Sequence, residues 1–241
     1  MLTDDSPFRN PPASMPAMQR VEVDGLRYAA DMLSLSVGRL YSNLHGVSTT
    51  VQRGSLPTET YALCIADAWA IVDDLWRFNK LLLHHMPDLK QTPDVKVREA
   101  LGAARQLRNG FQHLDERVTM CAREQLPLWG TLAWVFFPDG ATKAGKLFLM
   151  IPGSLRPSSS PFVNPAGQLI ASSVDVVTLT AFGHKLNLSF LVRHVAALIE
   201  ELDQDLRRST AGQPGGGADV LAVAEFVPQA TEGQSVSSGR D

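Results

Sequence analysis

The amino-acid sequence predicts a mainly α-helical domain with a small antiparallel β insert between its third and last long helices. Two observations support this fold class. Four long segments repeat apolar residues at steps of three and four, as one face of an α-helix requires. The region between the third and fourth of these segments is instead rich in β-branched and aromatic residues separated by turn residues, which is typical of strands.

The chain has 241 residues, of which 44% are hydrophobic, so it can bury one substantial core. We expect a helical domain over residues 20–208, with the β insert at about 129–182. Residues 1–19 are rich in Pro and Ser, and residues 209–241 in Gly, Ser and Gln. These compositions predict a flexible N-terminal segment and a flexible C-terminal tail.

The first two predicted helices follow directly from their apolar stripes. The first covers residues 23–45 and the second covers residues 59–86. Thr58 is a natural N-cap for the second helix, because its hydroxyl can accept a hydrogen bond from a free backbone N–H. Pro87 ends this helix, since proline lacks the N–H that a continuing helix needs.

The third predicted helix starts with Thr92 as its cap and Pro93 at its first position, and it continues without a break to Val118. The last helix covers residues 188–206, with Asn187 as its N-cap. Its broad apolar face can cover a small sheet, which needs such a partner to be stable.

The β insert is predicted as a hairpin followed by one more strand. The hairpin pairs residues 129–137 with residues 146–151 across a long loop, and the third strand covers residues 174–182. Alternation and β-branched composition support all three strands. We therefore expect an antiparallel sheet packed against the last helix.

The charge balance excludes a general attraction to nucleic acid, because 22 Lys and Arg face 25 Asp and Glu, for a net charge of -3. Any RNA contact must therefore come from a local basic cluster. The N-terminal region has no apolar run suited to a signal sequence or a membrane span, so we expect a soluble cytoplasmic protein. Cys64 and Cys121 are the only cysteines, and their apolar surroundings predict two buried free thiols in a reducing compartment.

The most unusual polar residues lie inside the third predicted helix. Arg108, Asn109 and His113 fall within one and a half helical turns. On a helical wheel, Asn109 and His113 lie roughly 150 to 170° from the centre of the apolar stripe. We therefore expect this face to point away from the core of its own subunit, where a second subunit can meet it.

Arg108, the Asn109 that follows it, and His113 resemble the motif of the HEPN superfamily, whose members carry an Arg and a His on the third helix of a small antiparallel helical bundle. The resemblance implies a homodimer whose composite cleft cleaves RNA without a metal or cofactor, as in toxin or defence ribonucleases. Arg108 would hold the scissile phosphate, and His113 would act as general base or acid. Asn109 would orient the phosphate or the imidazole, and an antitoxin would be a natural protein partner.

Other interpretations stay open at this point. The motif allows four to six residues between the Arg and the His, and Arg39 with His45 and Arg77 with His84 also satisfy this spacing. The spacing alone is therefore not specific. Residues five apart lie about 140° apart around a helix, so Arg108 does not face His113 within one subunit. The alternatives are a non-catalytic module that binds a nucleotide or a protein through this surface, and a structural dimer without a ligand. In both, Arg108 pairs with an acid such as Asp115 or one on the second helix.

The remaining candidates have simpler explanations. The adjacent His84 and His85 suit the negative end of a helix dipole better than a metal site. Trp69 and Trp76, seven residues apart, are expected in the core. The acids of the second helix, at positions 67, 73 and 74, are expected to form its solvated face.

Overall fold

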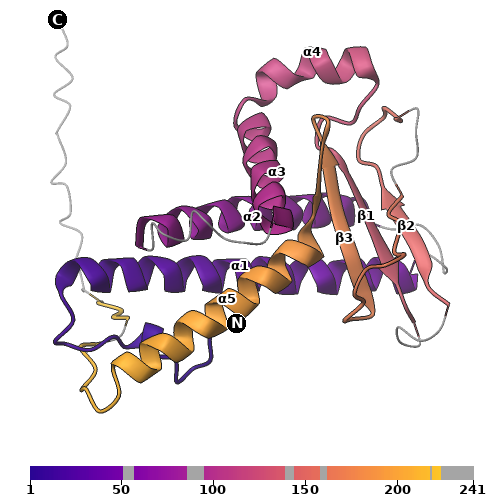
Figure 1. The fold of residues 1–241 in the computed structure, drawn as a ribbon. Helices are drawn as coiled ribbons and strands as arrows, with labels where there is room; N and C mark the ends of the chain where they lie inside the picture. Colours follow the sequence, from indigo (N-terminus) through magenta and orange to yellow (C-terminus); the bar gives the residue numbers. More distant parts are fainter. Residues whose placement is uncertain (51–56, 86–94, 139–143, 158–161, 218, 224–241) are drawn as a thin grey trace, which may run out of the picture.

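The computed structural model describes residues 1–50, 57–85, 95–138, 144–157, 162–217 and 219–223. The fold is mainly helical and includes one small antiparallel sheet, as predicted (Figure 1). The elements in chain order are η1 (Pro7–Arg9), α1 (Ala17–Thr50), α2 (Thr58–His85), α3 (Val95–Gln112), α4 (Leu114–Glu124), β1 (Thr131–Phe136), β2 (Lys146–Met150), β3 (Val174–Ala181), β4 (His184–Asn187) and α5 (Leu188–Ser209).

The long helices α1 and α2 run side by side, α5 crosses α1, and α3 rises from α2 (Figure 1). Leu33, Leu40 and Leu44 of α1 are fully buried in the core, which confirms the apolar stripe of the first helix. α1 is longer than predicted at both ends. α2 and α5 match their predictions closely, and the Asn187 side chain accepts a hydrogen bond from the backbone N–H of Phe190, as an N-cap does.

The prediction of one continuous third helix is wrong. α3 ends at Gln112, His113 has non-helical backbone angles, and α4 starts at Leu114 in a new direction (Figure 1). The bend lets α4 fold over the ring of Phe182, whose centroid lies 5.9 Å from the Arg117 guanidinium carbon. Val118, expected in the core stripe, is consequently exposed. The predicted cap at Thr92 and Pro93 lies outside the described residues.

The sheet has the strand order β2-β1-β3-β4, with every neighbouring pair antiparallel. The predicted hairpin and third strand are confirmed. The short β4 is a missed element, joined to β3 by the two-residue turn Phe182 and Gly183. Both turn residues have positive φ, at 52° and 79°, which is the backbone that two-residue hairpins favour and that glycine adopts readily.

One face of the sheet is covered by helices, and the other is covered by the loop between β2 and β3. Towards the helices, the indole N–H of Trp134 donates a 2.8 Å hydrogen bond to the hydroxyl of Ser48 on α1. On the other face, Ala133 and Val135 of β1 pack with Val163 from the loop between β2 and β3. The central strand β1 is therefore buried on both sides.

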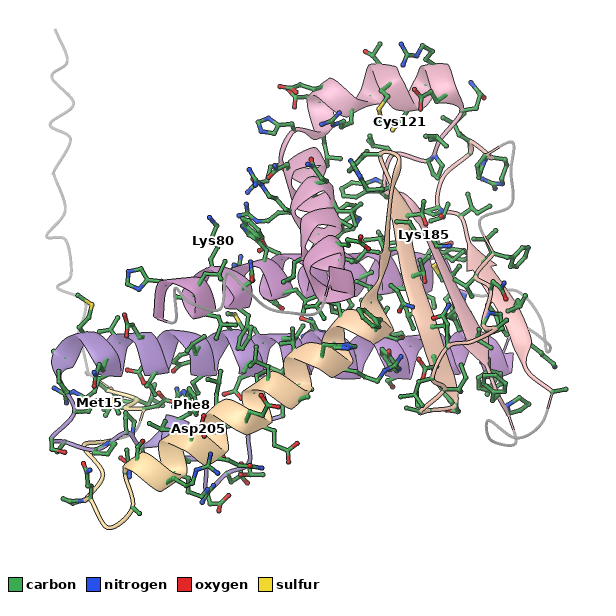
Figure 2. The ribbon with its side chains drawn as sticks, viewed as in Figure 1. Phe8, Met15, Lys80, Cys121, Lys185 and Asp205 are labelled. Carbon is green, nitrogen blue, oxygen red and sulfur yellow. The ribbon has the colours of Figure 1, made fainter. Side chains whose placement is uncertain are left out.

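Parts of both end segments pack against the helices, where composition predicts flexible segments. Phe8 of η1 is buried among residues of α1 and α5 (Figure 2). Pro12 forms a β-bridge with Gly215, so the N-terminal segment and the tail contact each other. The buried Phe8 and a few backbone contacts hold parts of these two segments in place. Average composition does not reveal such individual contacts, so it predicts flexible segments.

Candidate functional site

Arg108 lies on the last turns of α3 and points towards α2. Its Nε donates a 2.8 Å hydrogen bond to Oδ1 of Asp73, and its Nη1 donates a 3.1 Å hydrogen bond to Oε1 of Gln112. The side chain is 25% exposed. Arg108 thus pairs with an acid of the second helix, which is one of the pairings expected under the non-catalytic interpretations.

His113 lies in the bend between α3 and α4. Its side chain is 59% exposed, and its Nδ1 is 3.6 Å from Oε1 of Glu116. Asn109 is partly buried on α3. Arg108 and His113 therefore lie near the same end of α3, but each has its own acidic neighbour and the two do not form an ion pair or hydrogen-bonded cluster with one another.

A second arginine shares the carboxylate of Asp73. Nη2 of Arg77, one turn further along α2, forms an ion pair with Oδ2 of Asp73, and its Nη1 lies 3.4 Å from Oδ1 of Asp74. Asp74 is buried and accepts a hydrogen bond from the hydroxyl of Ser36. Burial raises the pKa of Asp74, despite this hydrogen bond and the nearby Arg77. The expectation of a solvated acidic face is wrong for Asp67 and for Asp74. Both are buried against α1, where Asp67 pairs with Arg39 and Asp74 with Ser36.

Beside these charges, a cavity of about 880 Å³ opens between α2, α3, Trp129 and Pro152, and we call it the α2–α3 pocket. Its charged end consists of Asp73, Arg77 and Arg108. Most of its wall is apolar or aromatic. The other lining residues are Thr58, Tyr61, Ala62, Ile65, Ala66, Trp69, Ala70, Val72, Phe111 and Gln112.

Three aromatic rings form one wall of the pocket. The rings of Trp69 and Phe111 stack with their centroids 4.6 Å apart, and Phe111 lies 5.8 Å from Trp129. The indole N–H of Trp69 donates a hydrogen bond to the carbonyl of Trp129. Trp69 is buried, as expected, whereas Trp129 is 44% exposed and presents ring surface at the pocket. The sequence does not mark Phe111 and Trp129 as pocket residues, because both occupy ordinary apolar positions in their segments.

The arrangement suits a ligand with a flat apolar part and a charged part. A rigid aromatic wall offers stacking and apolar contact, and two guanidinium groups offer charge-assisted hydrogen bonds. The carboxylate of Asp73 lies between the guanidinium groups and holds both in place. Small-molecule sites commonly combine a mostly apolar wall with a few such polar groups.

The described residues contain no group of three or more His, Cys, Asp or Glu side chains placed to hold a metal ion. Nδ1 of His84 instead lies 3.1 Å from Oε1 of Glu22. Cys64 and Cys121 are both buried free thiols, as predicted. Burial raises the pKa of Cys64 to about 11, which disfavours its nucleophilic thiolate.

Comparison with protein-family models, with curated proteins and with solved structures finds no match to this chain. No relative therefore supplies roles for the residues of the α2–α3 pocket, and the HEPN resemblance stays a prediction. Within the part of the chain that the structure describes, no helix is both long and apolar enough to cross a membrane.

Proposed function

We propose that this protein is a binding module for a nucleotide, which it takes up in the α2–α3 pocket. The proposal rests on one observation: a cavity of about 880 Å³ has an aromatic wall and is lined at one end by Arg77 and Arg108, which share the carboxylate of Asp73. Cavities of about 300 to 1,000 Å³ are typical of small-molecule sites. The pocket is therefore large enough for a base, a sugar and one or more phosphates.

The base would lie against Trp129. This indole is partly exposed at the pocket, while Trp69 and Phe111 stack behind it and hold the wall rigid. Stacking of one base on an aromatic side chain contributes about 1 to 3 kcal/mol. Every base has a π-face, so this contact supports binding without selecting one base.

The phosphate would lie at Arg108 and Arg77. Arg108 is partly exposed and lines the pocket, and its guanidinium is already oriented by Asp73 and Gln112. A fixed guanidinium suits phosphate because its planar donors match two phosphate oxygens. Asp73 opposes a phosphate electrostatically, so this arrangement favours moderate affinity and reversible binding over tight capture.

The proposal is tested by titrating tryptophan fluorescence with adenosine and uridine monophosphates and triphosphates in the presence of a chelator. We expect saturable quenching that Arg108→Gln weakens at least tenfold, or about 1.4 kcal/mol. Arg105→Gln is the matched control, because Arg105 is exposed on the same helix and does not line the pocket. Equal affinities in the two variants, or no quenching by any nucleotide, would contradict the proposal.

RNA cleavage by a HEPN-like homodimer is the second candidate. It is supported by the exposed position of His113 in the bend, near the end of α3 that carries Arg108. A second copy that packs on this bend would bring its own Arg108 or His113 to the first. The mainly helical fold, with Arg108 on its third long helix, also agrees with a HEPN-like bundle.

The cleavage proposal is tested by incubating RNA with the wild type and with His113→Ala in the presence of a chelator. Sedimentation at micromolar concentration gives the oligomeric state in the same buffer. Cleavage by the wild-type dimer and not by His113→Ala would support a ribonuclease. A monomer, or equal behaviour of both proteins, would leave nucleotide binding as the only proposed function.

A further inference from the structure

We propose that the buried Arg27 forms an oxyanion-binding site that the tail residue Asp219 occupies and that a phosphate- or carboxylate-bearing ligand can take over. The site is a cavity of about 430 Å³ between the N-terminal segment, α1 and the tail. Its charged lining residues are Arg9, Arg20, Asp24, Arg27 and Asp219, and we call it the tail pocket. It shares no lining residue with the α2–α3 pocket.

Arg27 is a buried cation with one acidic partner. Its side chain is 4% exposed, and its Nη2 donates hydrogen bonds of 2.6 and 2.7 Å to the two carboxylate oxygens of Asp219. Tyr28 supports the same anion, because its hydroxyl donates a 2.9 Å hydrogen bond to Oδ1 of Asp219. The Arg27 guanidinium carbon also lies 4.3 Å from the centroid of the Tyr28 ring. These contacts form a pre-organised receptor for one oxyanion.

The receptor has donors that Asp219 does not use. The buried Nε atoms of Arg27 and of Arg20 have no hydrogen-bond partner within the described part of the chain. A buried donor without a partner is costly, so a ligand that satisfies it gains affinity. A tetrahedral phosphate offers more acceptor oxygens, in more directions, than the planar carboxylate that now occupies the site.

The present occupant is replaceable. The Asp219 side chain is 65% exposed and belongs to a segment without helix or strand. The tail is held near the site by the bridge between Pro12 and Gly215 and by the hydrogen bond from the Gly217 N–H to Oδ1 of Asn10. Arg27, in contrast, is fixed on α1. A buried guanidinium needs an anion, but nothing in its position requires that the anion belong to the tail.

Arg9 also lines the tail pocket, but its guanidinium binds another carboxylate. It donates two hydrogen bonds of 2.9 Å to the two oxygens of Asp31. Besides Asp219, Asp24 is the only carboxylate among the pocket's lining residues. Departure of Asp219 would therefore leave an excess of positive charge in the tail pocket, which attracts small anions.

The proposal is tested on the full chain by isothermal titration with inorganic phosphate and with acetate, at an ionic strength held constant with sodium chloride. We expect Asp219→Ala to bind at least one of the anions at least tenfold more tightly than the wild type. The control Asp205→Ala should match the wild type, because Asp205 is exposed near the end of α5 (Figure 2), forms an ion pair with the exposed Arg208 and does not line the tail pocket. Tighter binding of phosphate or of acetate shows which of the two oxyanion classes the vacated site favours.

A second substitution tests whether the gained binding belongs to this site. Tyr28→Phe in the Asp219→Ala background removes an exposed hydroxyl, so the fold should persist, and it should weaken anion binding several-fold. Arg108→Gln in the same background should leave anion binding unchanged, which separates this site from the nucleotide pocket. Absence of anion binding by Asp219→Ala, or binding that Tyr28→Phe does not weaken, would overturn the proposal.

Discussion

The α2–α3 pocket and the tail pocket both place an arginine beside an aspartate, but they differ in how the aspartate is held. In the α2–α3 pocket, Asp73 and Arg108 both lie on long packed helices. In the tail pocket, Arg27 lies on a helix, whereas Asp219 lies on a segment without secondary structure. The first pair is part of the fold, and the second pair joins the fold to a peripheral segment.

Hydrogen-bond length alone does not set the free energy at which a contact opens. The bond to Asp219 is 2.6 Å long and the bond to Asp73 is 2.8 Å long, yet the shorter bond belongs to the exposed segment without helix or strand. The free energy of local opening depends on how many buried contacts open with the bond. Residues 219–223, the part of the tail described around Asp219, are all exposed, whereas α2 and α3 contribute buried residues to the core.

The largest expected effect comes from disturbing the close packing of α3, beside the α2–α3 pocket, against the turn between β3 and β4. A β-carbon on Gly110 would lie 2.4 Å from Cδ2 of Phe182, so Gly110→Ala should lower the free energy of unfolding by about 1 to 3 kcal/mol. Gly102→Ala is the matched control on the same helix, because its β-carbon position has no described neighbour within 4 Å apart from the adjoining helix backbone. Gly102→Ala should raise the free energy of unfolding by about 1 kcal/mol, because alanine favours the helix more than glycine does. Urea unfolding measures the free energy of unfolding of both variants. Similar changes in the two variants would contradict the close contact between Gly110 and Phe182.

A smaller effect is expected from removing the carboxylate that Arg77 and Arg108 share. Asp73→Asn should lower the free energy of unfolding by about 1 kcal/mol, the scale of a lost hydrogen bond. It should also tighten nucleotide binding several-fold, because a negative charge near the phosphate is gone. Fluorescence titration checks this against Asp115→Asn, an exposed acid on α4 that should change neither quantity. Weaker nucleotide binding by Asp73→Asn would argue against phosphate at this end of the pocket.

Substitution of Asp74, which follows Asp73 on α2, should raise the free energy of unfolding by an amount that depends on pH. The pKa of Asp74 is raised by burial, so the folded state holds its proton more tightly and loses stability as pH rises from the ordinary carboxyl range through the raised value. Asp74→Asn removes this cost and should stabilise by about 0.5 to 1 kcal/mol at pH 7. The gain should vanish near pH 3, where Asp74 is protonated in both states. Thermal unfolding at the two pH values measures it, and a loss at pH 7 would mean that the ion pair with Arg77 dominates.

The smallest effect on the whole fold is expected from acidifying the tail pocket. Hydrogen bonds from Arg27 and Tyr28 lower the pKa of Asp219, so the tail contact is complete above the ordinary carboxyl pKa. It should be lost only as pH falls through the lowered value. The NMR signals of the Tyr28 ring should then change while those of the core persist. Tyr28 signals that shift only together with global unfolding would show that the tail does not release separately.

Local sequence signals were sufficient for most of the helices and strands. The N-cap Asn187 and the apolar stripe after it located α5, and alternation located β1, β2 and β3. The break at His113 could not be predicted, because the apolar stripe continues through it. The break accompanies packing against Phe182, which is distant in the chain, and short-range periodicity carries no information about such a contact.

The candidate site was predicted only in part. The sequence distinguishes Arg108 and His113 from the residues around them, and it is compatible with the pairing of Arg108 with an acid of the second helix that the structure shows. The aromatic wall was missed because Phe111 and Trp129 differ from core residues only in exposure, which depends on the tertiary structure. Asp219 was missed for a related reason, because its partner Arg27 precedes it by 192 residues in the chain.

Because β1 is buried on both faces of the sheet, its amide hydrogens should exchange slowly with solvent. β1 lies between β2 and β3 (Figure 1), with the helices on one face and the loop around Val163 on the other. Solvent reaches its amides only when the sheet and at least one covering layer separate together. In deuterium, the amides of β1 should therefore be among the last to exchange, and their rate would report the frequency with which the entire molecule opens.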